Sequence, residues 1–199
     1  MNQKKWTPKY KPFRNLEGRL SLAERLKEKA DKELAKSSAQ IITSWIPFHY
    51  ELVLVSVVSS FEFFFRELVL NKHILNSKRK SKYYSKFSGR FNKKMVNFQN
   101  YDRIRNFLQN EFKIDIEMKM EPLEIEWLKF IIAIRHLLVH NGGFVDKKFM
   151  KLIKSFSHLK DEGYSMGKHV GTGSIDINVG IKIILKMMKI VEEEVKKLP

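Results

Sequence analysis

The sequence predicts an all-α protein folded as an antiparallel helical bundle, and three observations lead to that class. Apolar residues recur at helical spacing in several stretches, most clearly in residues 181–195 near the C-terminus. Residues 48–75 are apolar on nearly every side, which is expected of a helix at the centre of a bundle. Only residues 174–179 alternate as a strand does, and no second stretch of comparable strength is present to pair with them.

The composition indicates one compact domain preceded by a short arm. A chain of 199 residues with 43% hydrophobic residues can bury a core but is short for two domains. We expect an N-terminal arm in residues 1–16, where Pro8 and Pro12 should prevent a helix, and a single helical domain in residues 17–199. The basic and aromatic side chains of the arm suit either a solvated tail or stacking on nucleic-acid bases.

Two long helices are expected in the first half of the domain. The first should begin near Ser21, because Ser21 and Glu24 match a capping box, and it should end or kink near Pro47. The second should span residues 48–75.

The elements that follow are shorter until the last helix. In chain order we expect a helix at 102–112, an acidic connector at 115–121, a helix from Pro122 to about Asn141, a helix at 146–156, a glycine-rich loop at 161–180 and a final helix at 180–197. Pro122 suits a first helical turn, and Gly142 and Gly143 suit a left-handed C-terminal cap. Residues 174–179 are interpreted as a short strand or an extended lead-in to the final helix.

The chain has a formal net charge of +16, which favours a polyanionic partner. Residues 71–105 contain eleven lysine and arginine residues, interleaved with aromatic residues, and a single acid. This pattern predicts that a basic insertion at 77–100 binds single-stranded nucleic acid, which is RNA if the resemblance described below holds. The residues predicted to contact RNA are Lys78, Arg79, Lys80, Lys82, Tyr83, Tyr84, Lys86, Arg90, Lys93 and Lys94. A solvated loop is the alternative, and an anionic membrane surface is a weaker one because no clean amphipathic period is present.

The sequence indicates neither a secretory signal nor a membrane helix. No apolar region follows the basic N-terminus, and the longest apolar run, residues 52–70, contains Glu62, Arg66 and Glu67. We therefore expect a cytoplasmic protein without a membrane partner. The absence of cysteine fits a reducing compartment and excludes disulfides, thiolate metal sites and cysteine nucleophiles.

The strongest candidate for chemistry is the end of the helix that begins at Pro122. Arg135, His136 and His140 emerge there from an apolar run and lie on neighbouring rows of the last two turns. Arginine binds phosphate through a planar fork and histidine transfers protons near neutral pH, so the pattern suggests chemistry on a phosphodiester. The alternative is structural, with a histidine capping the helix and Arg135 neutralised by Glu62.

Glu62 lies among phenylalanines in the apolar second helix, where a carboxylate needs a cation. Arg66, one turn along the same helix, is the partner that we favour, and Arg135 is the distant alternative. Arg66 and His73 also match the pattern R-x(4–6)-H that Arg135 and His140 match, so the spacing alone is a weak signal.

Other chemistries have less support. His136 and His140 are spaced for zinc, but no adjacent HExxH glutamate and no third ligand are evident. The glycine-rich residues 171–174 lack the lysine of a phosphate-binding loop, and no nucleophile elbow is present. We therefore expect no metal and no cofactor.

The chain resembles the HEPN family of helical domains. The resemblance rests on Arg135-His136-x3-His140, which fits the family pattern R-x(4–6)-H with a polar residue directly after the arginine. The position of the motif at the end of a late helix fits too, as does Glu62 in an earlier buried helix. In layout the similarity covers roughly residues 20–198, but only the motif is specific.

The resemblance implies a metal-independent endoribonuclease, in which a 2′-hydroxyl attacks the adjacent phosphate and leaves a 2′,3′-cyclic phosphate and a 5′-hydroxyl. By position, Arg135 holds the scissile phosphate, His140 acts as general base or acid, and His136 orients the pair or touches phosphate. Asn141 adds a hydrogen bond, and Glu62 supports the site. The family also implies a homodimer with a composite cleft, and a toxin or anti-phage setting with an antitoxin or defence partner. Some members bind RNA or proteins without cutting, which leaves a non-catalytic module as the alternative.

Overall fold

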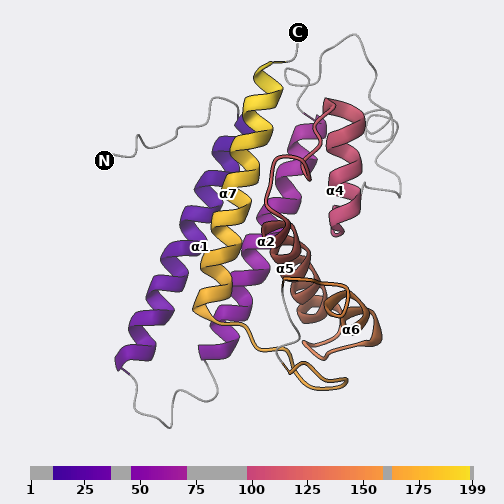
Figure 1. Ribbon diagram of the computed structural model, residues 1–199. Coiled ribbons are helices and arrows are strands. Elements are labelled where there is room, and N and C mark those ends of the chain that lie inside the picture. The colour runs from indigo at the N-terminus through magenta and orange to yellow at the C-terminus, as the bar shows by residue number, and fades with distance from the viewer. Residues whose placement is uncertain (1–10, 37–45, 71–97, 159–162, 198–199) are drawn as a thin grey trace, which may run out of the picture.

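The computed structural model describes residues 11–36, 46–70, 98–158 and 163–197, which form helices joined by short irregular segments (Figure 1). The elements are α1 Lys11–Lys36, α2 Ile46–Leu70, α4 Tyr101–Phe107, the π-helical turn η1 Leu108–Phe112, α5 Pro122–His140, α6 Lys147–Ile153 and α7 Ser174–Lys196. The described residues contain no strand, only an isolated bridge between Phe144 and His169. The predicted all-α class and the packing of helices as a bundle are confirmed.

Helices α1 and α2 pack against each other along their length in opposite directions (Figure 1). The ring of Phe13, near the start of α1, lies 4.9 Å from that of Phe64, near the end of α2. Close to the other end of the pair, the Tyr50 hydroxyl donates a hydrogen bond to Asp31. These contacts set the register between the two helices, and Glu62 therefore lies near the end of α2 that α5 also reaches.

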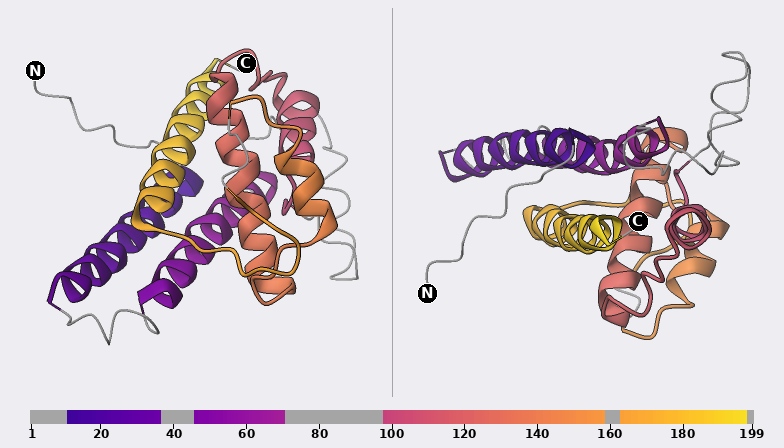
Figure 2. Two further views of the ribbon diagram at one scale, coloured as in Figure 1. Left: turned by 60° about the horizontal axis from the view of Figure 1, so that its bottom comes forward. Right: turned by 90° about the horizontal axis from the view of Figure 1, so that it is seen from above.

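Helix α7 packs on α1, α2 and α5, and it runs antiparallel to α5. Lys186 of α7 pairs with Glu124 at 2.6 Å, while nearer the start of α7 a Cβ at Gly180 would lie 3.2 Å from the Ile131 side chain. The missing side chain at Gly180 thus permits a close approach of the two helices. Figure 2 shows α4 and α6 on the side of α5 that faces away from α7.

Aromatic rings fill much of the core between these helices. The largest fully buried side chains include Phe13, Phe61, Phe64, Phe65, Phe98 and Phe107. Each lies within ring-contact distance of at least one other, mostly in edge-to-face geometry, which favours one fixed arrangement. Residues Phe48–Leu68 of α2 are long and apolar enough to cross a membrane, and more than half of that stretch is buried in the bundle.

The first helix begins ten residues earlier than Ser21, at Lys11, so the predicted helix start is wrong. Pro12 is tolerated because the first-turn N–H groups of a helix have no intrahelical partner to lose. Phe13 and Leu16, assigned to the arm, are buried in the core. Ser21 lies inside α1 and does not cap it.

The interpretation of residues 174–179 as a short strand or an extended lead-in is also wrong, because these residues form the first turns of α7. The Asp176 carboxylate accepts a hydrogen bond of 2.8 Å from the Gly173 N–H and caps the helix start. Ile177 is fully buried, so its apolar character serves the helix core rather than one face of a strand.

Several predictions concern residues outside those that the structure describes. These are the stacking role of the arm residues Trp6 and Tyr10, the continuation of the second helix to residue 75, and the RNA contacts of the basic insertion at 77–100.

Candidate functional site

Helix α5 delivers the candidate site residues, and its two ends are built as the sequence predicts. Pro122 occupies the first turn, and the Glu121 N–H donates to the Glu124 carboxylate at 2.9 Å. At the other end Gly142 and Gly143 have φ values of 60° and 82°, the left-handed conformation of a C-terminal cap. The chain therefore turns sharply after His140 and leaves that side chain exposed at the helix end.

Arg135 does not lie in an open groove but in the interior, where it pairs with Glu62 of α2. Its Nη2 lies 3.4 Å from Glu62 Oε2, and the two residues are only 8% and 4% exposed. The structure thus assigns the ion pair of Glu62 to the distant Arg135 and not to Arg66, the partner favoured from the sequence. A separation of 3.4 Å exceeds the ~2.7–2.9 Å of a strong charge-assisted hydrogen bond, so the pair is loose.

Polar atoms around this ion pair are incompletely satisfied. Among the described residues, Arg135 Nε and Nη1 and Glu62 Oε1 are buried without a hydrogen-bond partner. Burial raises the pKa of Glu62, and the cations of Arg135 and Arg66 and a hydrogen bond from Gln99 offset only part of that rise. Buried polar groups without partners are costly, which is typical of sites kept for a purpose other than stability.

His136 and His140 lie one helical turn apart, with ring centroids separated by 4.8 Å. His140 is exposed and close enough for its charge to act on the Glu62 carboxylate. Partial burial lowers the pKa of His136, and the nearby His140 and Lys148 lower it further. His136 is therefore neutral near pH 7, the form that accepts a proton.

Asn141, predicted to add a hydrogen bond at the site, is committed to the turn that follows α5. Its backbone caps the helix, and its side-chain amide donates to the Phe144 carbonyl. In this arrangement the Asn141 side chain stabilises the turn.

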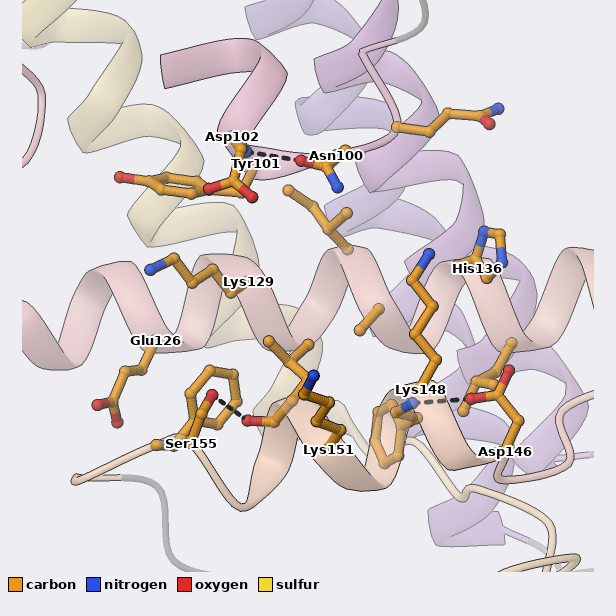
Figure 3. A pocket seen from close by; sticks show the side chains of 17 residues that line it. Asn100, Tyr101, Asp102, Glu126, Lys129, His136, Asp146, Lys148, Lys151 and Ser155 are labelled. Atoms are coloured by element: carbon orange, nitrogen blue, oxygen red, sulfur yellow. Dashed lines mark hydrogen bonds between the residues drawn. The ribbon is translucent and has the colours of Figure 1, made fainter. Parts of the chain in front are cut away.

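A pocket of about 480 Å³ opens between α4, α5 and α6, and His136 lines it (Figure 3). Three lysines surround this pocket: Lys129 of α5, and Lys148 and Lys151 of α6. Lys129 Nζ lies over the Tyr101 ring, 4.8 Å from its centroid. Figure 3 shows Lys148 reaching from α6 across to the neighbourhood of His136.

Gln99, just before α4, also lines this pocket and links it to the buried ion pair through its hydrogen bond to Glu62. The pocket therefore touches the candidate site at two places, through His136 and through Gln99.

Sequence reasoning missed the lysines of this pocket. Residues 147–154 contain four lysines at positions compatible with any face of a short helix. Only the docking of α6 against α5 determines that Lys148 and Lys151 line the same pocket as His136, while Lys147 and Lys154 do not. No local signal distinguishes the two pairs.

No protein-family model matches the chain, and neither the curated proteins nor the solved structures include a significant match. In the part of the chain that the structure describes, no three histidine or carboxylate side chains gather in a way that could hold a metal ion.

Proposed function

We propose that this protein is a metal-independent endoribonuclease whose reactive groups lie at the end of α5. The observation that carries the proposal is the meeting of a histidine pair, 4.8 Å between ring centroids, with a buried arginine anchored by Glu62. The +16 net charge supports a polyanionic substrate. The match of Arg135-His136-x3-His140 to the HEPN pattern supports RNA cleavage as the reaction.

The reaction needs one group to take a proton and another to give one. The base removes the proton of the ribose 2′-hydroxyl, and the 2′ oxygen bonds to phosphorus. The bond from phosphorus to the 5′ oxygen breaks, and the acid protonates that leaving oxygen. The products are a 2′,3′-cyclic phosphate and a 5′-hydroxyl.

His140 is assigned as base or acid because it is exposed at the helix end. The lowered pKa of His136 keeps it in the proton-accepting form, which suits it to act beside His140. Arg135, being buried against Glu62, serves in this proposal as a fixed positive charge below the histidines rather than as an open phosphate clamp.

The test uses purified protein and RNA in EDTA, comparing the wild type with His140→Ala. We expect His140→Ala to lower the cleavage rate by about 10²–10⁴-fold, the usual contribution of a general acid or base. His49→Ala, which removes an exposed histidine near the start of α2, is the matched control and should cut as the wild type does. Equal cleavage by wild type and His140→Ala would remove the catalytic assignment.

The alternative is a non-catalytic RNA-binding or protein-interaction module, and the burial of Arg135 favours it. A guanidinium paired with Glu62 inside the bundle has a structural role that requires no chemistry. This alternative predicts salt-sensitive RNA binding that survives the joint substitution of His136 and His140 by alanine, with no cleavage products at any enzyme concentration.

We also propose, from the HEPN resemblance, a cytoplasmic homodimer in which two α5 ends face one cleft, acting in a toxin or anti-phage setting with an antitoxin or defence partner. Sedimentation of the purified protein tests the dimer, since a monomer at micromolar concentration contradicts it.

A further inference from the structure

The pocket between α4, α5 and α6 combines an apolar floor with a cationic rim. Ile132 and Leu137 of α5 and Phe149 of α6 supply buried apolar surface. The rim carries Lys129 and Lys148 in addition to Lys151. A ligand that fits needs a flat apolar part and an anionic part, and its size must suit about 480 Å³.

The lysines of the rim are available to a ligand. Among the described residues, none of Lys129, Lys148 and Lys151 has a carboxylate within ion-pair distance. Lys129 is held at the pocket by its contact with the Tyr101 ring. Lysine side chains without carboxylate partners can donate charge-assisted hydrogen bonds to a bound anion.

Three acids also line the pocket, and two of them are occupied by the protein itself. Glu126 accepts hydrogen bonds from the backbone N–H groups of Ser157 and His158, both at 2.8 Å. Asp146 caps α6 by accepting from the Phe149 N–H at 2.7 Å. Asp102 is exposed in the first turn of α4. These carboxylates keep their charge, but Glu126 and Asp146 have oxygens turned to backbone N–H groups, whereas the three lysines have no carboxylate of the described residues within ion-pair distance and are the groups that can bond an anion.

We infer that this pocket binds one nucleotide of an RNA chain, with the base on the apolar floor and the phosphate held by Lys148 and Lys151. That this nucleotide adjoins the cleaved linkage rests on the proposed function. The pocket is connected to the candidate catalytic groups on two sides, since His136 lines it and Gln99 bonds to Glu62. A nucleotide seated there places its phosphate beside the histidine pair.

Helix α6 provides a matched pair of variants that separates this pocket from general basic charge. Lys148→Gln/Lys151→Gln removes two charges from the rim, whereas Lys147→Gln/Lys154→Gln removes two charges from the same helix outside the pocket. All four side chains are exposed, so both double variants should fold and unfold at similar temperatures. Net charge is identical in the two proteins.

The binding test titrates each protein with adenosine 5′-monophosphate, adenosine and inorganic phosphate by calorimetry. We expect the rim variant to bind the nucleotide about tenfold or more weakly for each charge-assisted bond lost. The Lys147/Lys154 control should stay within about twofold of the wild type, because neither side chain lines the pocket or can bond a ligand there. Equal affinities of the two double variants for the nucleotide would overturn the inference. It would also be overturned if an acidic peptide displaced the nucleotide as effectively as inorganic phosphate does.

A second variant blocks the pocket from its floor without changing charge. Ala133→Leu, on the pocket face of α5, fills part of the space and should weaken binding of both adenosine and the nucleotide. Unchanged adenosine binding by this variant contradicts a base-binding floor.

RNA cleavage then distinguishes failure of this inference from failure of the proposed function. If His140→Ala abolishes cleavage and the rim variant binds and cuts as the wild type does, the nuclease assignment stands and the nucleotide pocket is wrong. If the rim variant loses nucleotide binding while the wild type cuts no RNA, the pocket stands and the nuclease assignment is wrong. If the nuclease assignment and the nucleotide pocket are both correct, the rim variant raises KM for RNA with a smaller change in kcat.

Discussion

Arg135 Nη2 lies 3.4 Å from Glu62 Oε2, an ion pair that joins α5 to α2 across 73 residues of sequence. Both side chains are more than nine-tenths buried, so the pair links the candidate site to the centre of the bundle. Arg135 faces inward to this contact, while His136 is half-buried at the pocket and His140 is exposed.

Breaking the pair on one side is expected to destabilise the protein strongly. Arg135→Ala leaves the Glu62 carboxylate buried without its cation, which should lower the free energy of unfolding by about 3–5 kcal/mol. Glu62→Leu/Arg135→Met, which removes both charges, should lower it much less. Urea unfolding of the single and double variants measures the difference. Arg105→Ala, which breaks the half-exposed pair with Glu117, is the control and should cost no more than about 1 kcal/mol.

The lowered pKa of His136 predicts a pH dependence of stability. Because the unfolded histidine titrates at its ordinary value of 6.5 and the folded one lower, the unfolded state binds protons first as the pH falls. The contribution of His136 to the free energy of unfolding is therefore fully present above pH 6.5 and is lost as the pH falls through 6.5 towards the folded pKa. His136→Gln should make the free energy of unfolding less dependent on pH in this range, as measured by urea unfolding between pH 5 and 8.

The same pKa also reports on the pocket. Lys148 is one of the groups that lower the pKa of His136, so Lys148→Gln should raise it in an NMR titration of the imidazole ring. Lys147→Gln, outside the pocket, is the control. A His136 that titrates at or above 6.5 in the folded wild type contradicts both pH predictions.

Gly143 is predicted to be required at the turn after α5. Its φ is +82°, and a Cβ built there would overlap the His169 ring, so Gly143→Ala meets both backbone strain and a clash. We expect a loss of about 1–2 kcal/mol from the left-handed conformation alone, measured by thermal unfolding. Gly143→Ala/His169→Ala should recover only the part due to the clash.

The matched control for this variant is Gly18→Ala. Gly18 lies within α1, and a Cβ there meets nothing within 4 Å. The same chemical change should therefore stabilise the protein by about 0.5–1 kcal/mol, because alanine loses less backbone entropy in a helix than glycine does.

The start of α1 shows why local signals misplace a helix end. Ser21 and Glu24 match a capping box, yet both lie inside the helix. The earlier turns form because Phe13 packs against Phe64 of α2, a contact between residues about fifty positions apart. Tertiary packing of one aromatic ring outweighs the weak local preference for a start at Ser21.

The prediction for the start of α7 was wrong for a related reason. The alternation of Ile175, Ile177 and Val179 is short, and a run of that length is ambiguous between strand and helix. In the structure no neighbouring strand is present among the described residues to accept its hydrogen bonds, and the Asp176 cap favours the helix.

The sequence by itself determined the helical class, the bounds of α5 and the clustering of Arg135, His136 and His140 at its end. These features depend on spacing and capping within a few turns of one helix. Tertiary structure alone decided that Arg135 turns inward to Glu62, that His140 stays exposed, and that Lys148 meets His136 across a pocket. Such meetings join side chains from helices far apart in the chain, so their geometry depends on how α2, α5 and α6 rotate and dock.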